Sequence, residues 1–406
     1  MNFLFFNRSF YPDTEATGQF LTELCEDLAE FGHKVTVICG KSYHVGNDEN
    51  SSLIKRESYK SIEILRTSGT TLPKKNLFFR LINLGTYFLN AFFAGFLVKQ
   101  KPDVVVALTD PPLLGLHGIF FSIWHRAKFI YYCKDIYPDV GMITGKLRHP
   151  VYIFILKIAN NLSFKFAKRI ICIGEDMKEK IESKGDFREK IEIVHDWANT
   201  KELYPIDSNE NPFIRKHNLK NKFIIMYSGN IGLTQGLDRI IKIAEKFNKN
   251  ERVKFLLIGE GADKENLQKL VIKKELNNVI FLPYQPKEEL KYSLSAADIH
   301  LITFQKGLAG VIVPSKVYGI LACGRPFIAW IDEEGEISNI ASKYECGIVV
   351  PPGNTDKMIE KIKWSLTNED KLKEMGENGR RAAVEFFDRK VSVLKFNSVL
   401  MQVVGI

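Results

Sequence analysis

The sequence lacks the marks of several protein classes, and each absence excludes one of them. Its six cysteines form no CxxC pair and no metal-ligand spacing, so we expect reduced core thiols, with neither a disulfide framework nor a metal centre. The first residues have no basic lead, no full apolar region and no small-residue cleavage site, which predicts a first strand and a cytoplasmic protein. No basic run is interleaved with aromatics, and zinc-finger and RNP patterns are missing, which argues against nucleic acid as a partner.

What is present is the composition of a soluble α/β protein with two cores. The chain has 406 residues, of which 45% are hydrophobic and 26% charged. Its formal net charge of +9 comes from scattered lysines. They indicate either a solvated surface or an anionic partner such as a membrane surface.

The most apolar stretch is 77–98, but Arg80, Asn83 and Asn90 interrupt it, so we do not expect a membrane-spanning helix. The stretch predicts either a crossover helix or an amphipathic helix that dips into an anionic leaflet. The basic and aromatic segment 146–169 favours the second alternative. A peripheral position at the inner face of the cell membrane is therefore one prediction.

Short β-rich runs alternate with helical patterns along the whole chain, which predicts parallel strands joined by crossover helices. We expect two doubly wound, Rossmann-like domains that face a central cleft, over residues 1–200 and 205–387, with a last helix at 388–406 packing back on the first domain. The predicted strands are 3–6, 35–39, 62–65, 104–107, 129–132 and 170–173, then 223–227, 254–258, 279–282, 299–302, 326–329 and 347–350.

Three glycine-rich turns follow strands of the second half, at 228–236, 259–261 and 314–326. At a strand-to-helix turn, backbone N–H groups and the helix dipole favour an anion, and glycine lets a bulky anion approach closely. One such turn is weak evidence, but three in one domain predict a nucleotide.

Together these motifs resemble family-4 retaining glycosyltransferases of the GT-B fold, near the bacterial branch that builds O-antigen, capsule and colanic-acid sugars. The resemblance covers nearly the full length. It rests on Tyr11-Pro12-Asp13 with Gly18, residues 28–37, Pro102-Asp103, the loop 135–139, and the three glycine-rich turns with Pro314-Ser315-Lys316.

The chain also departs from the family pattern. Asn230 and Gln235 stand where many members carry Arg and Lys on the donor diphosphate, and Val311 and Gly319 stand where many carry two glutamates. The resemblance implies donor-binding residues at Gly18, Gly229, Asn230, Gly232, Gln235, Gly259, Tyr284, Val311 and Ser315. It implies catalytic roles for Asp135 and Lys316, and no metal or other cofactor.

Several of these residues have a structural alternative. Ser315 is a good helix N-cap, Asn230 suits a left-handed turn, Asp135 suits a turn cap and Gly18 suits a tight turn. Lys316 is different, because a lysine in the first turn of a helix opposes the dipole and so favours a ligand role. Its ammonium would supply charge that Asn230 and Gln235 cannot.

The predicted activity is transfer of a sugar, for which the branch suggests an aminosugar, from a nucleoside diphosphate to a polyprenyl-diphosphate-linked saccharide, with retention. The branch favours UDP as the nucleotide. A catalytically degenerate GT-B scaffold and a sugar-nucleotide epimerase are the alternatives. A scaffold would bind no nucleotide sugar, whereas an epimerase would convert one without an acceptor.

Overall fold

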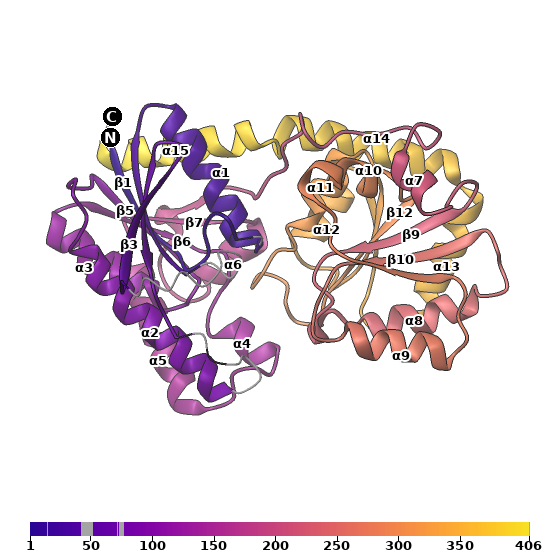
Figure 1. Ribbon diagram of the computed structural model, residues 1–406, viewed down its shortest axis with the longest axis horizontal. Helices are drawn as coiled ribbons and strands as arrows, with labels where there is room; N and C mark the ends of the chain where they lie inside the picture. The colour runs from indigo at the N-terminus through magenta and orange to yellow at the C-terminus, as the bar shows by residue number, and fades with distance from the viewer. Residues whose placement is uncertain (14, 42–51, 71, 73–76, 406) are drawn as a thin grey trace. The chain divides into compact units, whose positions relative to one another are not determined.

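The computed structural model describes residues 1–406 except 14, 42–51, 71, 73–76 and 406 (Figure 1). The chain forms two compact units, which we call the N-unit (Met1–His195 with Val393–Ile406) and the C-unit (Asp196–Ser392).

The N-unit is built on an eight-stranded sheet of order β3-β4-β2-β1-β5-β6-β7-β8. All neighbours pair in parallel except β3 and β4, which pair antiparallel. Its strands are β1 (Asn2–Phe6), β2 (Lys34–Gly40), β3 (Ile54–Tyr59), β4 (Ile62–Thr67), β5 (Val104–Leu108), β6 (Lys128–Tyr132), β7 (Arg169–Cys172) and β8 (Ile191–Ile193). Its helices are α1 (Ala16–Glu30), α2 (Leu77–Gly95), α3 (Leu114–His125), α4 (Asp139–Ile143), α5 (Pro150–Phe166), α6 (Glu175–Glu182) and α15 (Arg389–Val404).

The C-unit is built on a six-stranded parallel sheet of order β11-β10-β9-β12-β13-β14. Its strands are β9 (Phe223–Ser228), β10 (Val253–Ile258), β11 (Val279–Leu282), β12 (Ile299–Thr303), β13 (Phe327–Trp330) and β14 (Gly347–Val350). Its helices are α7 (Pro212–Lys216), α8 (Leu237–Lys246), α9 (Lys264–Lys273), α10 (Leu290–Ser295), α11 (Lys316–Ala322), α12 (Glu336–Lys343), α13 (Thr355–Thr367) and α14 (Glu369–Phe386). The predicted class, two doubly wound α/β units, is confirmed.

From Val393 onward the C-terminal helix α15 belongs to the N-unit, although the helix begins in the C-unit at Arg389. Phe396 is fully buried and its ring lies 5.0 Å from that of Tyr132 on β6. His33 Nε2 lies 2.9 Å from Asn397 Oδ1, so this histidine serves the packing of α15.

In each sheet the strand order reverses at one point, where crossover helices leave in opposite directions. The reversal lies between β1 and β5 in the N-unit and between β9 and β12 in the C-unit. Doubly wound sheets bind ligands beyond the carboxyl ends of the strands at such a point. These two strand ends are therefore where a site is expected.

Candidate functional site

The loop after β9 is held in shape by one buried tyrosine. The Tyr227 hydroxyl donates to the Asn230 carbonyl oxygen at 2.7 Å and to Gln235 Oε1 at 3.3 Å. The Thr303 hydroxyl, at the end of β12, donates to the Gln235 carbonyl oxygen at 2.7 Å. The first glycine-rich turn is thus fixed across the point where the strand order reverses.

The second glycine-rich turn packs directly against the first. The Gly229 amide donates to the Ile258 carbonyl, and the Ile231 amide donates to the Glu260 carbonyl at 2.8 Å. A Cβ atom on Gly259 would lie 1.9 Å from the Gly229 carbonyl oxygen, so only glycine permits this approach. Two backbone amides of the first turn therefore bond to the second turn and its strand, and are not available to a phosphate.

Lys316, in the third glycine-rich turn, lies beside the first turn, after β9. Its Nζ lies 3.8 Å from the centroid of the Tyr227 ring, and it would lie 2.9 Å from a Cβ placed on Gly229. Within the described part of the chain this buried Nζ has no hydrogen-bond partner. Burial lowers the pKa of Lys316 to about 7. A buried cation donor beside a glycine-rich turn is suited to a phosphate.

Arg239, on the first turn of α8, is a second cation that the sequence analysis missed. A Cβ on Gly236 would lie 2.3 Å from its Nη2, so the guanidinium is folded back over the turn, and it stacks on Trp330 at 4.9 Å. Like Lys316, it opposes a helix dipole, and this signal was available in the sequence.

The other predicted donor-side residues lie nearby with varied roles. Tyr284 follows β11, is 52% exposed, and its hydroxyl bonds the Glu260 backbone. Val311 is buried, and its amide donates to the Leu308 carbonyl, so its side chain is not exposed to a ligand. The Gly232 carbonyl accepts from the Gln235 amide.

Two structural alternatives on this side were wrong. Ser315 occupies the N-cap position of α11, but its hydroxyl makes no capping hydrogen bond, because the residue already has helical backbone angles. Asn230 is exposed and is not among the described residues with positive φ, so it is not a left-handed turn residue.

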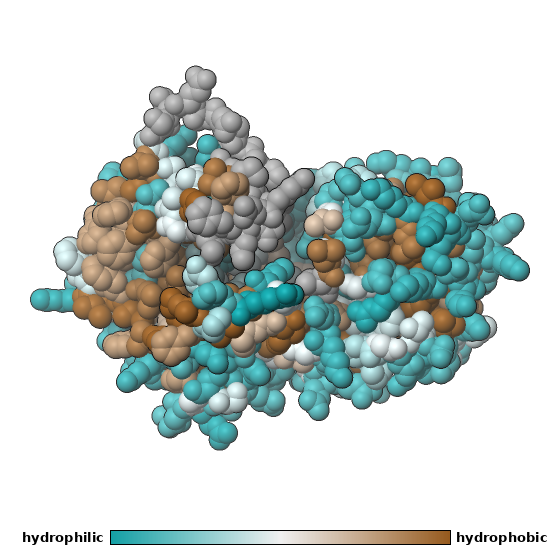
Figure 2. Space-filling model, turned by 90° about the horizontal axis from the view of Figure 1, so that it is seen from below, coloured by the Kyte–Doolittle hydropathy of each residue, from teal (hydrophilic) through white to brown (hydrophobic). Residues whose placement is uncertain are grey.

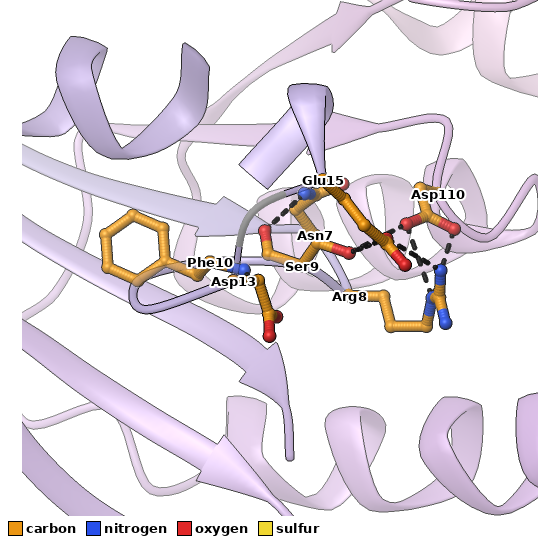
Figure 3. A network of polar contacts seen from close by, with 7 residues as sticks. All are labelled: Asn7, Arg8, Ser9, Phe10, Asp13, Glu15 and Asp110. Carbon is orange, nitrogen blue, oxygen red and sulfur yellow. Dashed lines mark hydrogen bonds and ion pairs between the residues drawn. The ribbon is translucent and has the colours of Figure 1, made fainter. Parts of the chain in front are cut away.

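In the N-unit, polar side chains gather where β1 and β5 end (Figure 3). Arg8 donates to Asp110 Oδ1 from Nε and to Glu15 Oε2 from Nη2, both at 3.2 Å. The Ser9 hydroxyl donates to Glu15 at 2.6 Å, and the buried Asn7 amide donates to the Ser9 carbonyl. These half-exposed carboxylates can accept hydrogen bonds from sugar hydroxyls. The sequence analysis did not select them, although Asp110 closely follows the predicted strand 104–107 and Glu15 immediately precedes α1.

Asp135 lies at the same edge of the N-unit sheet. Its amide donates to Thr109 Oγ1 at 3.2 Å, which ties the loop after β6 to the residue before Asp110. Burial, then the charges of Asp135 and Asp110, raise the pKa of Tyr137. The predicted role of Asp135 in the reaction stays a prediction.

Gly18 lies within α1 and does not form a tight turn, so that alternative was wrong. A Cβ there would lie 3.1 Å from Ser9 Cβ and 3.3 Å from the Phe10 amide nitrogen. Its small size thus lets α1 pack closely on the loop after β1.

Within the described ranges, no three His, Cys, Asp or Glu side chains come together as metal ligands. Independence from metals stays a prediction.

Two family models match the chain, one in each half. The model described as Glycosyltransferase Family 4 matches residues 17–202, and that described as Glycosyl transferases group 1 matches 209–382. The chain belongs to glycosyltransferase family 4. It is therefore a transferase with the GT-B fold.

The chain is also similar to individual relatives and solved structures. It is 27% identical to WbjE of Pseudomonas aeruginosa over 63% of the present chain. This match spans 64% of WbjE, slightly under two thirds of that relative. It is 24% identical to WcaI of Escherichia coli K12, named for colanic acid biosynthesis, over 90% and 92% of the two chains. The Anabaena HepE structure with UDP has a TM-score of 0.75 at 14% identity and covers 99% of this chain and 100% of HepE.

Proposed function

We propose that this glycosyltransferase moves a sugar from a UDP-linked donor to a hydroxyl of a polyprenyl-diphosphate-linked saccharide, with retention, in the biosynthesis of a surface polysaccharide such as O-antigen or capsule. The observation that supports donor binding is the Lys316 Nζ beside the Gly229 turn, which has no hydrogen-bond partner among the described residues. The name of WcaI, which refers to colanic acid biosynthesis, supports the choice of pathway class, and the HepE complex supports UDP.

Lys316 and Arg239 together replace the two cations that Asn230 and Gln235 do not supply. Both lie against the first glycine-rich turn, one from α11 and one from α8. As the bond from the anomeric carbon to the phosphate oxygen breaks, charge grows on the diphosphate, and these cations stabilise it. The acceptor oxygen bonds to the anomeric carbon on the same face, and its proton passes to the released phosphate.

The N-unit would bind the acceptor. Asp110, Glu15 and Asp135 offer carboxylate oxygens at one sheet edge, which suits the hydroxyl groups of a saccharide.

In the C-unit, Tyr284, half exposed beside the Glu260 loop, offers an aromatic surface for the uracil ring of the donor.

A thermal unfolding series with UDP, GDP, dTDP and CMP tests the donor half. A ligand at a hundredfold excess over its Kd stabilises the folded state by about 2.7 kcal/mol, and we expect this with UDP. Arg239→Met should weaken UDP affinity by about 10- to 100-fold, because a charge-assisted phosphate contact is lost.

Lys242→Met is the matched control, since Lys242 lies on the same helix α8 and pairs with Asp238 at 3.6 Å. It should bind UDP as the wild type does. No stabilisation by any nucleotide would favour the scaffold. Conversion of a UDP-sugar without acceptor would favour the epimerase. Anomeric configuration of the product, measured by NMR, tests retention.

A further inference from the structure

The N-unit carries a large exposed apolar face on three helices. Its members include Phe93 of α2, Phe96 directly after α2, Ile123 and Trp124 of α3, and Phe154 and Phe166 of α5, which we call the apolar face. Ile123 is 67% exposed, Phe154 64% and Trp124 60%. On the face seen in Figure 2, hydrophobic surface gathers on the N-unit, whereas the C-unit is mostly hydrophilic on that face. A patch of this kind on a folded unit indicates an interaction site.

The face is continuous and firmly built. The Phe96 ring, directly after α2, lies 5.2 Å from the Trp124 ring of α3, so the end of α2 contacts α3. A Cβ on Gly115 of α3 would lie 2.0 Å from Ser163 Oγ of α5, so these two helices are in close contact. The exposed side chains are therefore held on a rigid support.

The three segments that carry this face have charges of one sign, although Arg169 pairs with Glu192 of β8. Residues 77–101, 111–128 and 146–169 contain eleven Lys and Arg and no Asp or Glu. The formal charge of the whole chain is +9, so the remaining residues together are slightly acidic. Among the basic residues, Lys157 and Lys165 lie exposed on α5, and Arg126 and Lys128 lie exposed after α3.

We propose that the apolar face inserts into the headgroup region of a bilayer that contains anionic lipids, with the surrounding lysines and arginines bound to phosphate headgroups. Apolar and aromatic side chains ringed by cations are the pattern of helices that lie in a membrane interface. A second copy of the chain fits less well, because a symmetric pair would bring two sets of these cations together. No described helix has the length and apolar content to cross a bilayer.

The proposal goes beyond transfer of the sugar, and it can be tested separately. The whole protein is mixed with vesicles of phosphatidylcholine alone or with about one third phosphatidylglycerol, and bound protein is collected by flotation. We expect binding to the anionic vesicles that salt weakens but does not abolish, because apolar side chains have entered the bilayer. Fluorescence of Trp124 should shift to the blue on binding, and Trp124→Phe should remove this shift.

Ile123→Asp should weaken vesicle binding about tenfold or more. The change removes an apolar contact with the bilayer and adds a negative charge, which the anionic lipid repels. The matched control is Ile272→Asp on α9 of the C-unit, where the isoleucine is 75% exposed. It should bind vesicles as the wild type does. Both variants should keep UDP binding, so failure of one proposal is distinct from failure of the other.

Three results would overturn the inference. They are equal vesicle binding by the wild type and Ile123→Asp, complete release by salt, and light scattering that shows a dimer which Ile123→Asp dissociates. The last would assign the face to a second copy.

Discussion

Lys316 is placed where its charge is poorly solvated. Its Nζ lies over the Tyr227 ring and, among the residues that the structure describes, has no hydrogen-bond partner. Such an arrangement destabilises the free protein. Under the proposed function, it would favour the complex with a diphosphate, so that Lys316 lowers stability in order to bind the donor.

Lys316→Met should therefore stabilise the free protein while it abolishes donor binding. Removal of an unpaired buried cation should raise the free energy of unfolding by about 1–3 kcal/mol, because methionine fills the same space without a polar group. Urea unfolding measures the first effect and calorimetry with UDP the second. A variant that is less stable than the wild type would contradict this account of Lys316.

The pH dependence of stability and of UDP binding gives a second test of Lys316, because the two quantities should change in opposite directions. Burial lowers the pKa of Lys316 from 10.5 to about 7, so between these values the unfolded chain holds a proton that the folded protein has lost. The free energy of unfolding should then rise with pH across this window, and Lys316→Met should lack that contribution. UDP affinity should fall over the same range, because the anion binds the charged amine. Calorimetry at pH 6.5, 7.5 and 8.5 would show whether affinity instead stays constant.

At single residues, the sequence was informative where charge opposed the helix dipole. That rule selected Lys316, and it applies equally to Arg239. The sequence was a poor guide to the backbone conformation of Ser315 and Asn230. A residue type only favours the angles of a helix cap or a left-handed turn and does not fix them.

At the scale of the elements, glycines set the distance between the helices that carry the apolar face. Gly115 allows α3 to touch Ser163 of α5, whereas a Cβ on Gly85 of α2 would meet nothing within 4 Å. Replacing glycine by alanine should thus change the free energy of unfolding in opposite directions at these two positions.

Gly115→Ala should lower the free energy of unfolding by about 1–3 kcal/mol, because the added methyl group forces α3 and α5 apart. Gly85→Ala should raise it by about 0.5–1 kcal/mol, since alanine restricts the unfolded chain and favours the helix. Chemical denaturation of both variants provides the comparison. Two changes of the same sign would show that the helix spacing does not depend on Gly115.

The predicted strands are present, and the two that were missed have weak sequence signals. β3 is an edge strand with no buried residue, and its sequence lacks an apolar run. β8 has only three residues. Buried parallel strands such as β5 are apolar throughout and were recognised for that reason.

At the scale of the whole molecule, the last helix joins the end of the chain to its beginning. Phe396→Ala should cost the N-unit about 3–5 kcal/mol, because a fully buried ring beside Tyr132 is lost. Hydrogen exchange should become faster in β1 and β6 and stay unchanged in β9 and β10. UDP should still protect the C-unit. Equal acceleration in β9 would show that the two units unfold as one.

The Tyr227 hydroxyl, which holds both Asn230 and Gln235, has a consequence for the thermodynamics of binding. A loop rich in glycine loses much conformational entropy when it becomes ordered. Here that entropy is lost when the chain folds. A nucleotide that reaches the turn after β9 therefore meets a surface whose shape is already set, and its binding energy need not be spent on ordering residues 228–235.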